Sequence, residues 1–300
     1  MQKIPVGQTI AFAYHFLFAR IGTIIGIAWL PAVLSSAVSY MISTYAAMHR
    51  AEFEAGDPRA AAAYMLVSLL GLVVTIFMAS VVAVAITRQV LGQGSSGVVL
   101  YFAAGRSEWR MLAANFRYLL AVLAMIAFAA TITALAFLLS GIPLGAPEQI
   151  QPSAATILAG LISWFVFLYA LVTILRVGFL LPPSIVAEEK GGLRRSYELT
   201  KGNVWRALAV LLALGLPLLL LMLGGEAAVL RAALGPDFAR MNPTEFFQRA
   251  GQAMEAKLLP WTIFTTVIFI LGSGLIYSGA AFAYRAAVGQ AQQPSPPPRS

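Results

Sequence analysis

The chain contains no cysteine, and charged side chains make up only 11% of its 300 residues, whereas hydrophobic residues make up 60%. The absence of cysteine excludes disulfides and thiolate metal sites. The low charge content excludes an ordinary soluble domain, whose water-facing surface requires about 25% charged residues. Most of the surface of this protein is therefore expected to face lipid.

Asp, Glu, Lys and Arg are missing from six long stretches, the shortest of which has 19 residues. As a helix, that stretch spans about 28 Å, close to the ~30 Å thickness of a bilayer core. None of the stretches alternates like a barrel strand. We therefore predict an all-α, polytopic six-helix transmembrane bundle in a single domain, residues 1–290, with a disordered Pro-rich tail, 291–300. The predicted spans lie near 22–46, 62–86, 118–140, 155–181, 206–225 and 261–284.

Basic residues are distributed unequally between the two sets of loops that six spans create. One set, which includes both termini, receives 13 Lys or Arg, and the other set receives 6. The positive-inside rule places the richer set, with the N- and C-termini, in the cytoplasm. The net charge of +8 thus reflects topology and attraction to anionic lipid headgroups. No nucleic-acid partner is expected.

An aromatic pattern occurs twice, 96 residues apart. Tyr101 is followed eight residues later by Trp109, and Tyr197 is followed eight residues later by Trp205; an arginine comes next in both cases. Tyr14 marks a degenerate third copy near the N-terminus. The pattern indicates up to three repeated units, each an interfacial helix, a span, an outer loop and a second span.

Amphipathic segments precede three of the spans and are expected to lie along the cytoplasmic surface. At 100° per residue, one side of the third segment carries Leu193, Tyr197, Thr200 and Val204, flanked by Arg194, Arg195, Glu198 and Lys201. In the first segment the apolar side carries Ile10, Tyr14, Leu17 and Ile21. Gly202 is predicted to end the third segment in a left-handed conformation, and Arg194 is predicted to pair with Glu198.

Small residues at helical spacing occur in the first and last spans. Gly22 and Gly26 lie four residues apart in the first, and Gly274 and Ser278 in the last. Apolar burial offers little preference between helix and lipid, so close approach over small residues is a main source of helix association. We expect these positions to be packing contacts.

Residues 181–189 read Leu-Pro-Pro-Ser-Ile-Val-Ala-Glu-Glu, and residues 193–205 read Leu-Arg-Arg-Ser-Tyr-Glu-Leu-Thr-Lys-Gly-Asn-Val-Trp. This stretch resembles the signature of a bacterial multispanning family that includes the membrane domain of some glycerophosphoryl diester phosphodiesterases. The resemblance implies a helical fold in the bacterial inner (plasma) membrane. It implies no phosphodiesterase activity, because the catalytic barrel would require roughly 250 further residues.

Residues suited to catalysis or metal binding do not come together in this sequence. His15 and His49 fall on opposite sides of the membrane in the predicted topology. Glu188 and Glu189 adjoin Lys190 and two arginines, which is typical of a charged surface network. We therefore expect no catalytic residue, no metal site and no cofactor, and predict that the protein is not an enzyme.

Arg176 is the one charge inside a predicted span. Its side chain can extend to the headgroups, or it can face the bundle and bind a lipid phosphate or an acidic partner in the Glu188–Glu189 turn. With the basic loop that follows, it forms the candidate contact for an anionic lipid or a membrane partner. The candidate residues are Arg176, Arg194, Arg195, Tyr197, Asn203, Trp205 and Arg206.

Three functions are compatible with this sequence. The first is a non-enzymatic inner-membrane protein that organises or senses lipid, or assists a membrane protein partner. The second is a small-molecule or lipid transporter, which would need matching interruptions in its spans. The third is a lipid-modifying enzyme. The sequence favours the first, with anionic membrane lipids as partners.

Overall fold

The computed structural model describes residues 2–94, 105–139, 154–188, 191–235, 242, 249–252 and 256–289. Throughout this part of the chain the regular secondary structure is helical. The long helices are α2 (Ile21–Met48), α4 (Pro58–Val90), α5 (Arg106–Leu139), α6 (Ala154–Phe179), α9 (Val204–Leu234) and α11 (Leu258–Ala287). All six are long and apolar enough to cross a membrane, which confirms the predicted all-α class of a multi-pass membrane protein. The short helices are α1 (Val6–Ala19), α3 (Arg50–Glu54), α7 (Leu181–Ala187) and α8 (Leu193–Thr200).

Helix ends largely follow local chemistry. Asp57 accepts a hydrogen bond of 2.8 Å from the backbone N–H of Arg59, and Pro58 occupies the first turn of α4. The helices extend beyond the predicted spans at most ends, but the prediction 155–181 runs past the end of α6. The chain turns at Leu180 because Pro182, which lacks an N–H, starts the separate helix α7.

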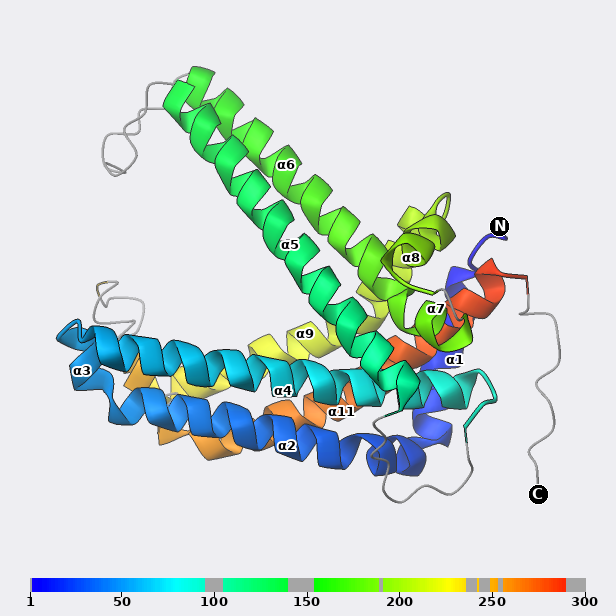
Figure 1. Ribbon diagram of the computed structural model, residues 1–300, viewed down its shortest axis with the longest axis horizontal. Helices are drawn as coiled ribbons and strands as arrows, with labels where there is room; N and C mark the ends of the chain where they lie inside the picture. The colour runs from blue at the N-terminus through cyan, green and yellow to red at the C-terminus, as the bar shows by residue number, and fades with distance from the viewer. Residues whose placement is uncertain are drawn as a thin grey trace.

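Three of the short helices gather at one end of the long ones, as Figure 1 shows: α1, α7 and α8 lie opposite the end that carries α3. The backbone N–H of Gln2 donates to the carbonyl of Ala287 over 3.3 Å, so the N-terminal segment adjoins the end of α11. We call this end the collar. It comprises residues 2–4, Arg88, 105–110, Arg176, 181–188, 191–206 and 284–287.

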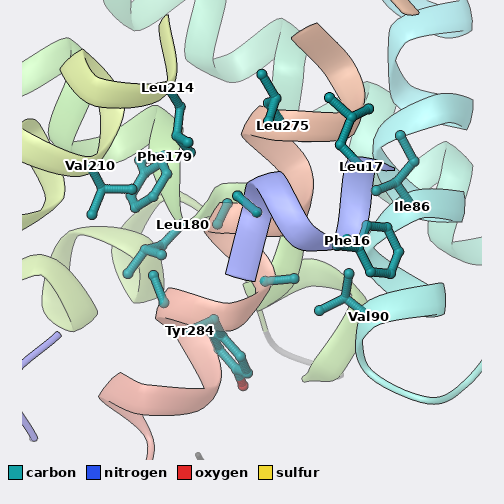
Figure 2. Packing of buried hydrophobic residues seen from close by; sticks show 14 of the residues in the cluster. Phe16, Leu17, Ile86, Val90, Phe179, Leu180, Val210, Leu214, Leu275 and Tyr284 are labelled. Atoms are coloured by element: carbon teal, nitrogen blue, oxygen red, sulfur yellow. The ribbon is translucent and has the colours of Figure 1, made fainter. Parts of the chain in front are cut away.

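The main hydrophobic cluster lies next to the collar, where side chains of α1 pack against those of α4, α9 and α11 (Figure 2). Its largest members are Phe16, Leu17, Ile86, Val90, Phe179, Leu180, Val210, Leu214, Leu275 and Tyr284. Away from this end the hairpin of α5 and α6 diverges from α2 and α4, as Figure 1 shows. Packing is thus concentrated where the short helices contribute additional apolar side chains.

The buried side of helix α1 overlaps only in part with the expected apolar side, which carried Ile10, Tyr14, Leu17 and Ile21. Its buried residues are Thr9, Ala13, Phe16 and Leu17, whereas Ile10 and Tyr14 are only half-buried. The apolar side of α1 lies against α9 and α11, because small residues there admit it. A Cβ added to Gly274 would lie 2.9 Å from Leu17 Cδ1, and one added to Gly279 would lie 3.5 Å from the Cβ of Ala13.

The small-residue predictions therefore hold for the last span. Gly274 faces side chains of α1 and α2, and Ser278 is fully buried. In α2 Gly26 is buried, but a Cβ added to Gly22 would meet nothing within 4 Å, so Gly22 makes no close packing contact. Apolar spacing alone did not show which side of α2 faces the other helices.

Large apolar side chains remain exposed along the diverging hairpin and α9. Leu120 and Phe128 of α5 are both 65% exposed, and Phe165 of α6 is 64% exposed. Such a surface is incompatible with water over this length and fits a hydrocarbon environment, where helices satisfy their own backbone groups. This apolar surface accounts for the low charge content of the sequence.

The repeat stays a prediction. Trp109 and Trp205 both lie in the first turn of a long helix. Tyr101, which precedes Trp109 in the pattern, lies outside the described residues, so the structure does not test the match between the two units. The predicted tail, 291–300, also lies outside them.

Candidate functional site

All seven candidate residues lie at the collar. Arg176 is in the last turn of α6, Arg194, Arg195 and Tyr197 are on α8, Asn203 precedes α9, and Trp205 and Arg206 are in its first turn. The structure divides them into residues bound inside the protein and residues presented at its surface.

Two glycines shape the loop that carries α8. A Cβ at Gly191 would collide with the backbone carbonyl of Ser184, so the approach of the loop to α7 requires glycine. Gly202 has a φ of 82°, which confirms the predicted left-handed residue after α8. A glycine thus lies close to each end of α8.

Helix α8 is docked on the end of α6. Ser196 Oγ donates to the carbonyl of Val177 over 2.6 Å, and Leu199 is 1% exposed. The buried side is Ser196, Leu199 and Thr200, whereas Tyr197, expected on the apolar side with Thr200, is 44% exposed. The prediction assumed that α8 rests on lipid. In the structure α8 packs against the end of α6, and this contact determines which side of α8 is buried.

Arg176 is held by α8. Its Nε donates to Thr200 Oγ1 over 3.0 Å, its Nη2 donates to the carbonyl of Tyr197 over 3.3 Å, and its guanidinium carbon lies 3.8 Å from the centroid of the Tyr197 ring. Stacking on an aromatic ring and two hydrogen bonds fix the direction of the guanidinium. Of the predicted acidic partners in the Glu188–Glu189 turn, Glu188 binds Arg195 and Tyr284 instead of Arg176, and Glu189 lies outside the described residues.

Glu188 joins three helices. Arg195 Nε lies 2.9 Å from both carboxylate oxygens, and the Tyr284 hydroxyl donates to Oε1 over 2.7 Å. Arg110 Nη2 donates to the backbone carbonyl of Glu188 over 2.9 Å. Arg195 therefore serves an internal, charge-assisted network that ties α8 to α5 and α11.

Arg194 is presented outward. Its Nε lies 3.1 Å from Glu198 Oε1, which confirms the predicted i,i+4 pair, and its side chain is 94% exposed. An exposed pair of this kind contributes at most about 1 kcal/mol and exchanges partners readily. Arg194 can therefore contact another anion at little cost.

Asn203 and Arg206 bind the N-terminal segment. Asn203 Oδ1 accepts from the N–H of Ile4 over 3.0 Å, and its Nδ2 donates to the carbonyl of Gln2 over 3.0 Å. Arg206 Nη1 donates to the carbonyl of Ile4 over 3.1 Å. Because Asn203 is 3% exposed, its amide acts within the protein. These two side chains clamp an extended segment as a neighbouring strand would.

Trp205 is 75% exposed beside this clamp. With Tyr197 it places two amphipathic rings at the end of the spans. Aromatic residues concentrate at this level of a membrane, where the ring contacts apolar material and the polar atom contacts headgroups. Their exposure is suited to a membrane interface.

Sequence reasoning missed a buried ion pair. Arg88 Nη1 lies 3.0 Å from Glu108 Oε1, its Nη2 donates to Ser107 Oγ over 3.0 Å, and the Glu108 side chain is fully buried. The pair connects α4 to α5 at the collar. Glu108 adjoins the Trp-Arg motif, but nothing in the sequence indicates its partner 20 residues away.

The titratable side chains in the described part of the chain form no cluster suited to holding a metal ion. Within these residues no three His, Asp or Glu side chains come together as metal ligands. His49 Nδ1 contacts the carbonyl of Tyr45 over 3.0 Å near α3, and His15 lies exposed on α1 at the other end of the protein.

Comparison with models of protein families, with curated proteins and with solved structures gives no match to this chain. The resemblance of residues 181–205 to a bacterial membrane family stays a prediction. Function is therefore argued from the collar itself.

Proposed function

We propose that this chain is a non-enzymatic protein of the bacterial inner membrane that binds anionic lipids at its collar, and thereby organises or senses lipid or assists a membrane partner. The unequal distribution of Lys and Arg supports a cytoplasmic position for the collar and both termini. The resemblance to a bacterial multispanning family supports the same location.

The outward presentation of cations and aromatic rings carries the proposal. Arg194 is 94% exposed, Trp205 is 75% exposed and Tyr197 is 44% exposed at the same end of the spans. Each basic residue near an anionic surface contributes on the order of 1 kcal/mol. The rings anchor this level of the protein at the headgroups, so the cations meet phosphate there.

Internal contacts make this surface a rigid support. Arg195, Glu188 and Tyr284 connect α8 to α11, and Ser196 connects α8 to α6. A fixed arrangement of donors loses less conformational entropy on binding than flexible loops do. Geometry can therefore add selectivity to a modest electrostatic attraction.

The transporter and the lipid-modifying enzyme are distinguished from this proposal by activity in reconstituted vesicles. Movement of a fluorescent lipid between leaflets would favour transport. Conversion of the lipid to a new product would favour an enzyme. Retention of anionic lipid without either activity is the result we expect.

The direct test replaces two exposed cations, one on α8 and one directly after it. We expect Arg194→Gln with Lys201→Gln to reduce the anionic lipid that co-purifies with the protein, because both side chains are exposed and Arg194 makes only a weak surface pair. Arg59→Gln, an exposed site at the opposite end, is the matched control. If the unmodified protein, the double variant and the control retain equal amounts of anionic lipid, and all three insert into the membrane as before, the proposal is contradicted.

A further inference from the structure

A shallow hollow lies between α6 and α9 next to α8; its enclosed space is only about 10 Å³, and the rest of it is open to the surroundings. Six of its seven lining residues are apolar, and the seventh is Arg176. The lining comprises Val172, Leu175, Arg176, Val204, Ala207, Leu208 and Leu211. The hollow thus combines one cation with an apolar wall.

Arg176 retains donors for a ligand. A guanidinium has five N–H groups. One donates to Thr200 and one to Tyr197, and no ion pair between described residues includes Arg176. Three N–H groups therefore stay available on a side chain whose direction is fixed by the Tyr197 ring. Planar forks of this kind bind phosphate oxygens in pairs.

The distance of the hollow from the ends of α6 and α9 indicates its depth in a bilayer. Arg176 lies three residues before the end of α6, roughly 5 Å along the axis. Leu211 lies seven residues after the start of α9, roughly 10 Å along. The cation is thus at the headgroup level, beside the Tyr197 ring, and the apolar wall continues into the hydrocarbon. A ligand of this hollow needs an anionic group at the headgroup level and an apolar chain that extends toward the middle of the membrane.

We propose that this hollow is a binding site for a single phospholipid, with its phosphate on Arg176 and one acyl chain against Leu208 and Leu211. The inference rests on the proposed function and deepens it by naming the ligand class and its site. Arg194 and Lys201 then recruit anionic lipid to the surface, whereas the α6–α9 hollow holds one molecule in a defined orientation.

The test measures phosphatidylglycerol bound to the full-length, detergent-purified protein by native mass spectrometry. We expect one molecule to stay bound to the unmodified protein. Arg176→Gln and Leu208→Trp should each weaken that binding by about tenfold or more, through loss of charge-assisted hydrogen bonds and through filling of the hollow. Leu219→Trp, at a lipid-facing position 53% exposed on the same helix, should leave it unchanged.

Two variants are needed because Arg176 also holds α8. Leu208→Trp removes none of the hydrogen-bond partners of Arg176, which are Thr200 and Tyr197, so loss of lipid in that variant reports on the apolar wall of the hollow. Loss in Arg176→Gln with full retention in Leu208→Trp would overturn the proposal, since the lipid would then have no chain in the hollow. Retention in both variants would overturn it as well.

Competing ligands identify the part of the lipid that is bound. We expect excess diacylglycerol, which lacks phosphate, and excess inorganic phosphate, which lacks a chain, to leave phosphatidylglycerol in place. Displacement by either one would overturn the two-part site. If Arg194→Gln with Lys201→Gln reduces co-purified lipid while both hollow variants retain the single molecule, this inference fails and the proposed function stands. If no variant has an effect, both fail.

Discussion

The clamp on the N-terminal segment allows a sharp test of the collar. Asn203→Ala removes the acceptor of the Ile4 N–H and the donor to the Gln2 carbonyl, both at 3.0 Å. Asn203 is the N-cap residue of α9, but its side chain makes no capping hydrogen bond, so the substitution removes no cap from this helix. The change therefore isolates the two hydrogen bonds.

Its magnitude follows from burial. Ile4 is fully buried and Asn203 is 3% exposed, so water cannot replace the lost partner of the Ile4 N–H without opening the segment, whereas Gln2 is exposed and its carbonyl can bind water. A buried group left without a partner costs about 1–3 kcal/mol. We expect the N-terminal segment to lose about 1–3 kcal/mol of local stability, while Ile4 keeps its apolar contacts and the spans stay folded.

Amide hydrogen exchange measures this loss where it occurs. A decrease of about 2 kcal/mol speeds exchange at Ile4 roughly 30-fold, because each 1.4 kcal/mol is a factor of ten. Lys201→Ala, exposed and two residues away, is the matched control and should not change the rate. Equal exchange at Ile4 in both variants would refute the clamp.

Three further outcomes are expected. Gly191→Ala should abolish recovery of folded, monodisperse protein because its Cβ collides with the Ser184 carbonyl, whereas Gly192→Ala, with nothing within 4 Å, should be tolerated. Glu108→Gln should cost about 3–5 kcal/mol by breaking a buried ion pair, seen as a lower melting temperature, whereas Glu198→Gln should cost under about 1 kcal/mol. A cysteine at position 201 should react with an impermeant thiol reagent only after cells are opened; labelling in sealed cells would contradict the cytoplasmic collar.

Span positions could be predicted because they depend on local composition. An uncharged stretch long enough to cross hydrocarbon forms a helix there, since each backbone group must find its partner within the segment. The same locality explains why Gly202 and the Arg194–Glu198 pair were predicted correctly. A turn or an i,i+4 contact involves only neighbours in the chain.

The binding partners of the candidate site residues could not be predicted from their neighbours in the chain. Asn203 was expected to contact lipid, but its partners Gln2 and Ile4 are about 200 residues away in sequence. Arg195 is held by Glu188, which also binds the hydroxyl of Tyr284, 96 residues further on. A side chain type shows what can be bound, but only the assembled helices determine which partner lies within reach.

Sequence alone determined that this chain is a helical, multi-pass membrane protein with its cations concentrated at one set of span ends, because hydrophobic length and charge are properties of the chain. The tertiary structure decided which sides of α1 and α8 are buried. Leu17 fits where Gly274 leaves room, and Ser196 and Leu199 meet the end of α6. Such choices depend on the matching of shapes between segments far apart in sequence, and no periodicity within one segment contains that information.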